Sequence, residues 1–183
     1  MDYLQLIDKY YPEGPLREIY LTHCRQVAGK AHAIAHAKSL PLTDDEIVEA
    51  AMLHDIGIVM TNAAGIHCYG TAPYIAHGVE GAKIIREAGL DEKYARIAER
   101  HTGAGITAAD IARQHLPLPE GEYCPLTLLE KLICYADKFF SKTKLTQEKP
   151  LDRIVASLKK FDFTDSDGAV ARFMELHRQF GQE

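Results

Sequence analysis

The sequence lacks the features of a membrane or secreted protein. No apolar run approaches the roughly 20 residues that a membrane-spanning helix needs. The first residues, MDYLQ, include neither a basic segment nor the apolar stretch of a signal peptide. The four cysteines are scattered and form no Cys-x-x-Cys pair, as is typical of reduced cysteines. The sequence therefore predicts a cytoplasmic protein without a membrane partner.

An excess of positive charge is also missing. Lys and Arg number 21 and Asp and Glu number 26, so the formal net charge is −5 with neutral histidines. A surface that holds nucleic acid by bulk electrostatics needs the opposite balance. The composition therefore argues against a nucleic-acid partner held by bulk electrostatics, and leaves a local basic patch open.

Strand patterns are nearly absent, and helical periodicity runs along almost the whole chain. The 183 residues, 46% of them hydrophobic, fit one domain and can bury a substantial core. Capping boxes at Thr43 with Glu46 and at Thr127 with Glu130 mark two helix starts. The sequence predicts a single all-α domain over residues 1–183. Its expected helices cover residues 3–10, 15–39, 43–55, 76–88, 91–101, 107–115, 128–142, 151–161 and 167–180, with a long loop over 58–73.

Imidazole and carboxylate groups fall on the apolar faces or at the ends of these helices. His54 and Asp55 are adjacent at the end of one helix, and Gly57 then lets the chain turn sharply. A lone histidine on an apolar face is usually structural, but six such groups on successive helices are hard to explain separately. Together they suit a divalent metal such as Mn, Fe, Co, Ni, Zn or Mg. The six are His23, His54, Asp55, His77, His101 and Asp137.

The order of these residues resembles the HD superfamily of metal-dependent phosphohydrolases. It reads His23, then His54 and Asp55 within an intact HDIG motif, then Asp137. The segments EAAMLHDIG, AHGVEGAKII, AERHTGAG and ICYADK look like successive helices of that family. The resemblance covers about residues 15–144 and implies an HD-domain-like helical bundle, which the C-terminal helices over about 151–180 would complete.

The resemblance also implies roles for the six groups. By position, His23, His54, Asp55 and Asp137 would bind one metal ion. His77 and His101 match the extra histidines of binuclear members, in which Asp55 would bridge two ions. The implied cofactor is one or two divalent metal ions, with Asp55, His77 and His101 at the reacting centre.

The implied activity is hydrolysis of a phosphate ester of a nucleotide or small phosphometabolite by metal-activated water. Such a site needs a cation for the phosphate charge. Lys144 lies seven residues after Asp137, about two helical turns, and would share the ligand face if the helix extends that far. Lys138, beside Asp137, is another candidate, and Arg100, beside His101, is a similar one.

Two other functions stay open. A di-iron oxygenase similar to myo-inositol oxygenase would use the same ligand pattern, but many oxygenase-branch members have a lysine directly after HDIG, and this chain has Ile58 there. A non-catalytic, metal-bound ligand sensor is the other alternative, and the complete ligand set argues against it. His67 in the long loop is a candidate for lining the site, whereas His32 and His36 are expected on the surface.

Overall fold

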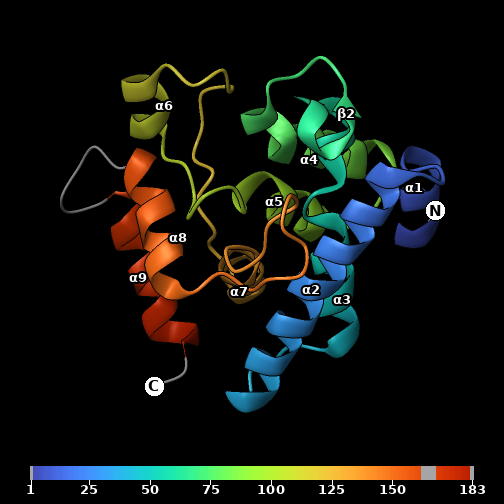
Figure 1. The fold of residues 1–183 in the computed structure, drawn as a ribbon. Coiled ribbons are helices and arrows are strands. Elements are labelled where there is room, and N and C mark those ends of the chain that lie inside the picture. The colour runs from blue at the N-terminus through green and yellow to red at the C-terminus, as the bar shows by residue number, and fades with distance from the viewer. Residues whose placement is uncertain (1, 162–167, 182–183) are drawn as a thin grey trace.

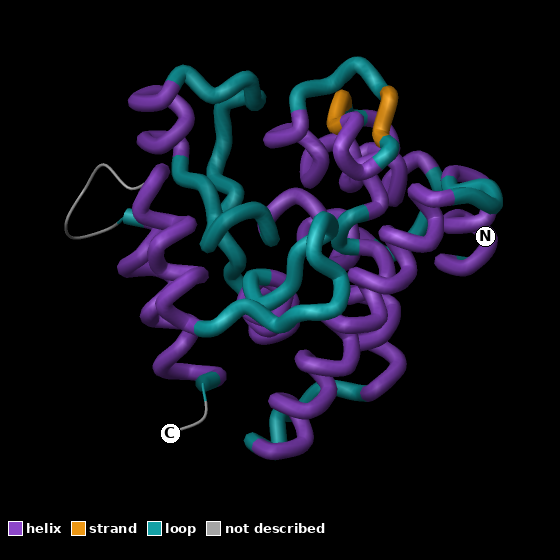
Figure 2. Tube along the Cα trace, viewed as in Figure 1, coloured by secondary structure: helices purple, strands orange, loops and turns teal. Residues whose placement is uncertain are grey.

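The computed structural model describes residues 2–161 and 168–181. This part of the chain is a bundle of α-helices with short 3₁₀ turns and one small two-stranded ribbon (Figures 1 and 2), which confirms the predicted all-α class. The helices are α1 (Tyr3–Tyr10), α2 (Pro15–Ala37), α3 (Asp44–Leu53), α4 (His77–Glu87), α5 (Glu92–Arg100), α6 (Ala108–Gln114), α7 (Leu128–Asp137), α8 (Leu151–Leu158) and α9 (Ala169–Phe180). No helix among the described residues is both long and apolar enough to cross a membrane.

Helix α7 lies at the centre of the bundle. It contacts α2, α3 and α5 on one side and α9 on the other, and Figure 1 shows it end-on between these groups. Almost every residue of α7 is buried, including the polar Glu130 and Asp137. A helix that is apolar nearly all round requires neighbours on every side. The fold therefore carries Asp137 into the interior.

The helix starts follow from local chemistry. Thr43 accepts a hydrogen bond from the Glu46 amide at 3.2 Å, and Thr127 accepts one from the Glu130 amide at the same distance. In each case the glutamate also bonds back to the threonine, which completes a capping box. Both predicted helix starts are confirmed.

The helix end that differs most in its consequence for the site is that of α7. Helix α7 ends at Asp137 rather than near Lys142, and the chain from 138 to 150 forms a loop that closes where the Lys149 amide donates to the Phe139 carbonyl. The expectation that Lys144 lies on the ligand face of this helix is therefore wrong. The predicted start of the last helix, residue 167, lies outside the described residues, and α9 is described from Ala169.

The long loop after α3 contains short elements of its own. It begins with the 3₁₀ turn η1 (Ile56–Met60), passes through the paired strands β1 (Asn62–Ala63) and β2 (Cys68–Tyr69) with η2 (Ala64–Ile66) between them, and ends in η3 (Tyr74–Ala76). Turn η1 packs directly against α4. The loop therefore joins the two helices that deliver Asp55 and His77.

Candidate metal centre

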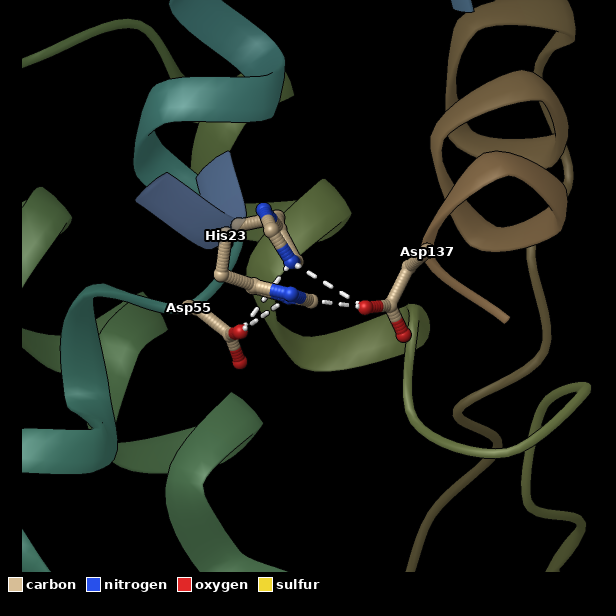
Figure 3. Close-up of side chains that lie close together, drawn as sticks. His23, Asp55 and Asp137 are labelled. Carbon is tan, nitrogen blue, oxygen red and sulfur yellow. Dashed lines mark ion pairs between the residues drawn. The ribbon is translucent and has the colours of Figure 1, made fainter. Parts of the chain in front are cut away.

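Four buried side chains from three helices converge on one point. His23 comes from the middle of α2, His54 and Asp55 from the end of α3, and Asp137 from the end of α7. The His23 Nε2 atom lies 3.0 Å from Asp55 Oδ2 and 3.0 Å from Asp137 Oδ1. Figure 3 shows these three side chains converging. The His54 Nε2 atom lies 3.2 Å and 3.5 Å from the same two oxygens.

The geometry of this group fits a metal ion better than a hydrogen-bond network. The Nε2 atoms of His23 and His54 and the Oδ1 atom of Asp55 are buried without a hydrogen bond, despite the short distances around them. Burying polar atoms without partners is costly. Atoms that bind one ion at about 2.0–2.2 Å, with right angles between the bonds, are about 3 Å apart. The two imidazoles and two carboxylates therefore form a donor set that can hold a divalent ion.

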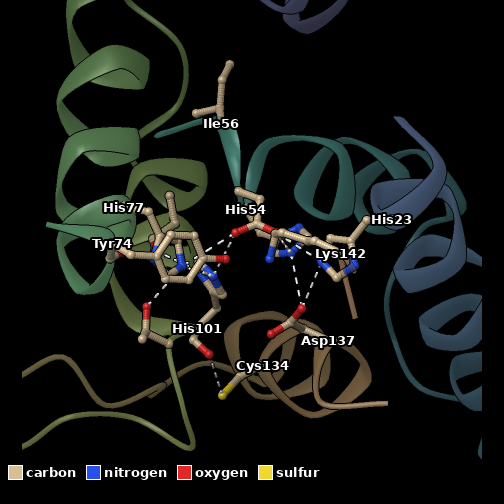
Figure 4. Close-up of polar contacts among 12 residues, drawn as sticks. His23, His54, Ile56, Tyr74, His77, His101, Cys134, Asp137 and Lys142 are labelled. Atoms are coloured by element: carbon tan, nitrogen blue, oxygen red, sulfur yellow. Dashed lines mark hydrogen bonds and ion pairs between the residues drawn. The ribbon is translucent and has the colours of Figure 1, made fainter. Parts of the chain in front are cut away.

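A second group shares Asp55. Its Oδ1 atom lies 3.3 Å from His101 Nε2 and 3.5 Å from His77 Nε2, and these two nitrogens are 3.0 Å apart. Figure 4 shows His77 and His101 beside the group formed by His23, His54 and Asp137. The two oxygens of Asp55 thus face different sets of ligands. This arrangement is compatible with a carboxylate shared by two ions.

The backbone orients three of the imidazoles in the same way. In each, the Nδ1 atom is 2.6–2.7 Å from the carbonyl oxygen three residues earlier and can donate to it. The pairs are His54 with Ala51, His77 with Tyr74 and His101 with Ala98. A proton held on Nδ1 leaves Nε2 as the unprotonated atom that a metal needs.

Gly57 lets the two ligand-bearing segments approach closely. A Cβ atom at this position would lie 2.1 Å from the His77 carbonyl oxygen and 2.2 Å from the Gly81 amide nitrogen, both backbone atoms of α4. Gly57 is not among the residues with positive φ. The expected role in a sharp turn is therefore replaced by a packing role, which keeps η1 against α4 and Asp55 near His77.

Burial and neighbouring charges set the protonation of the centre. Burial opposes the charge on Asp55, but Lys142 and His54 hold the pKa of this carboxyl well below its usual range. Burial, together with the neighbouring His101, lowers the pKa of His77 to about 3. A charged carboxylate and a neutral imidazole are the forms that bind metal.

A cavity of about 420 Å³ opens beside these groups. His77, His101 and Asp137 form part of its wall, and three lysines, Lys138, Lys142 and Lys149, form another part. The Lys142 ammonium is 2.5 Å from Asp55 Oδ2, and the Lys138 ammonium is 2.7 Å from Asp137 Oδ2. The chain as a whole has a net charge of −5, so three lysines on one cavity wall contrast with its overall charge.

The structure brings all six predicted ligands together, but it distributes the other candidates differently. Lys144 is exposed and does not line the cavity; Lys142, which the sequence analysis did not select, reaches Asp55 instead. Arg100 pairs with Glu130 at 3.2 Å and does not line the cavity either. His67 is exposed and lies outside the cavity wall, although Gly65 and Ile66 contribute to it.

The remaining histidine pair lies on the surface, as predicted. His32 is half-buried and His36 is exposed, and the Nε2 atom of each is 3.0 Å from the same oxygen of Asp44. These three side chains form a separate group of potential ligands at the junction of α2 and α3.

Comparisons with known proteins agree with this geometry. Residues 20–141 match the HD domain family. A protein of Methanocaldococcus jannaschii, described as uncharacterized, is 36% identical over 146 residues, which cover 78% of this chain and 77% of that protein. No solved structure matches the chain.

Two further relatives are longer proteins. Both are named tRNA (cytidine(56)-2′-O)-methyltransferase, one from Picrophilus torridus at 32% identity and one from Thermoplasma volcanium at 31%. The matches cover 80% and 94% of this chain but only 38% and 44% of the two relatives. This chain thus corresponds to less than half of each of them. The family match over most of its length shows that the chain belongs to the HD domain family.

Proposed function

We propose that this protein is a metal-dependent phosphohydrolase that cleaves a phosphate ester of a nucleotide or small phosphometabolite, with residues 1–183 acting as one HD-type domain. The observation that carries the proposal is the cavity in which three lysines face a buried set of histidine and aspartate ligands. Hydrolysis of a phosphate ester requires an activated water molecule and positive charge that compensates the phosphate. The metal ligands of this cavity would serve the first requirement, and its lysines would serve the second.

The metal ligands divide into two sets that share Asp55. His23, His54 and Asp137 would hold one ion with it, and His77 and His101 would hold a second. Bound divalent ions lower the pKa of a coordinated water and neutralise phosphoryl oxygens. The protein supplies the ligand set, with three imidazoles oriented by backbone carbonyls, and a cavity large enough for a small ester.

The lysines would bind the phosphoryl group. Lys142 contacts Asp55, Lys138 contacts Asp137, and Lys149 lines the same cavity. We assign to Lys142 the phosphate-binding role expected of Lys144, since Lys142 contacts Asp55 and Lys144 is exposed. The hydroxyl groups of Thr102, Ser141 and Thr143 border the same space and can donate to phosphoryl oxygens.

The rival functions differ from this one in their measurable products. Ile58, at the position where many oxygenase-branch members have a lysine, is fully buried in the core, so that residue offers no cation to the cavity. A di-iron oxygenase would consume oxygen when loaded with iron under anaerobic conditions and then exposed to air. A sensor would bind a phosphate ester without releasing phosphate.

The names of the two longer relatives bear on the substrate. Those names describe methyl transfer to tRNA, and this chain matches less than half of each of those proteins. The names are therefore no basis for assigning methyl transfer to this chain. They do make RNA-borne phosphate worth testing beside small esters, despite the net negative charge. A substrate panel should therefore include tRNA and short oligoribonucleotides with terminal phosphates.

The test is release of inorganic phosphate from this panel by protein loaded with Mn, Co, Ni, Fe or Mg. The proposal predicts metal-dependent release that is lost in Asp55→Asn and retained in His36→Ala, a change of an exposed histidine outside the cavity. Oxygen uptake by the iron-loaded protein without phosphate release would favour the oxygenase. Binding of esters without either reaction would favour the sensor.

A further inference from the structure

A second cavity lies beside the first and differs from it in character. Its volume is about 350 Å³, and it shares Thr102, Lys138 and Lys149 with the lysine-lined cavity. Most of its remaining wall is apolar, and five large aliphatic side chains form part of it. This part comes from η3, the loop after α5, the segment after α6, and α8, and consists of Ile75, Ile106, Leu116, Ile154 and Leu158.

Two of the charged groups on the wall of this second cavity, Asp110 and Arg172, form an ion pair. Asp110 accepts a hydrogen bond from Arg172 at 2.7 Å, and Arg172 also donates to the Gly105 carbonyl at 3.0 Å. A ligand there would meet aliphatic side chains and a neutralised ion pair. Most of this surface is apolar, and such a surface favours an apolar group because burying it removes apolar area from water.

We propose that this second cavity binds the organic part of the substrate, and that this part is aromatic or aliphatic and no larger than about two fused rings. The proposal rests on the proposed phosphohydrolase function. Thr102, Lys138 and Lys149 line both cavities, so the two spaces are neighbours, and a molecule that reaches past these side chains would place its phosphate among the lysines and its apolar group beside α8. Mostly apolar pockets with a few placed polar groups are typical of small-molecule sites.

The inference narrows the substrate class. It favours esters such as aryl or alkyl phosphates over phosphates of simple sugars. It also assigns specificity to residues of α6 and α8, outside the metal ligands.

The experiment compares two non-hydrolysable probes by titration calorimetry, methylphosphonate and naphthalen-1-ylmethylphosphonate, with Mn-loaded protein. We expect the naphthyl probe to bind at least about tenfold more tightly, because its rings leave water on binding. Ser157→Trp places a large side chain at the cavity wall and should remove this preference without changing methylphosphonate binding. Ala156→Trp, an exposed neighbour on α8 outside the cavity wall, is the matched control and should keep the preference.

A second variant tests the same point independently, in case Ser157→Trp does not fold. Gln114→Trp on α6 enters the same cavity from another wall and should have the same effect as Ser157→Trp. Equal affinities of the two probes for the wild type would overturn the inference and leave the phosphohydrolase proposal intact. So would equal losses in the cavity and control variants. If neither phosphonate binds while 1-naphthalenemethanol does, the proposed function fails and the apolar cavity remains a ligand site.

Discussion

Replacing Gly57 with alanine tests whether the close approach of η1 and α4 builds the centre. The added Cβ atom would lie 2.1 Å from the His77 carbonyl oxygen, whereas ordinary contacts begin near 3.4 Å. The neighbouring atoms are backbone, so a side-chain rotation cannot relieve the overlap. The two segments must separate by about an ångström, and the imidazole of His77 must move with its helix.

The expected cost follows from this overlap. Inserting a methyl group into a tightly packed interior usually costs about 1–3 kcal/mol. For a chain of this length, 1 kcal/mol changes the melting temperature by about 2–4 °C. We therefore expect Gly57→Ala to melt about 2–12 °C below the wild type, measured by circular dichroism in the presence of a chelator. The displaced His77 should also weaken the second metal position, which elemental analysis of Mn-loaded protein would detect.

Gly29→Ala is the matched control. Gly29 lies in the interior of α2, and a Cβ atom there would meet nothing within 4 Å. Alanine is favoured over glycine in a helix by about 0.5–1 kcal/mol, so this variant should melt slightly above the wild type. The packing argument is refuted if the two variants have the same melting temperature and the same metal content.

Three further outcomes are expected. Lys142→Gln should raise KM for a phosphate ester about 10- to 100-fold, because a charged hydrogen bond contributes about 1.5–3 kcal/mol. Lys144→Gln should leave KM unchanged, and equal effects of the two changes would contradict the assignment of Lys142. Burial, together with the neighbouring Lys138 and Lys142, lowers the pKa of Lys149 to about 8 despite the opposing charge of Asp137. Lys149 is therefore cationic below that pH, so the affinity for phosphate should fall as the pH rises above it. Lys149→Arg should move this loss of affinity to higher pH. If the pH dependence of phosphate affinity is the same in both proteins, Lys149 is not its cause. Mn added to chelator-treated protein at 100 times the Mn dissociation constant should stabilise the protein by about 2.7 kcal/mol, which raises the melting temperature by about 5–11 °C. An unchanged melting temperature would contradict a metal site in the folded protein.

The sequence was most informative where the chemistry is local. Capping boxes at Thr43 and Thr127 predicted helix starts from residues three positions apart. The HDIG motif and its order relative to Asp137 selected the groups that the structure brings together. Helical periodicity then placed these groups on buried faces without further information.

The parts that sequence reasoning missed depend on tertiary contacts. Periodicity continues through residues 138–142, so it could not show that α7 ends at Asp137 and frees Lys142 to reach back to Asp55. The role of Gly57 depends on the backbone of α4, 20 or more residues away. The second cavity draws its aliphatic wall from positions between 75 and 158, which share no sequence pattern.

The central claim is that the buried histidines and aspartates hold divalent metal. The most direct test is anomalous diffraction at the manganese edge from crystals grown with Mn. The account predicts one peak beside His23, His54, Asp55 and Asp137, and a second beside Asp55, His77 and His101. The absence of a peak at Asp55, or a peak only beside the surface group of His32, His36 and Asp44, would contradict it.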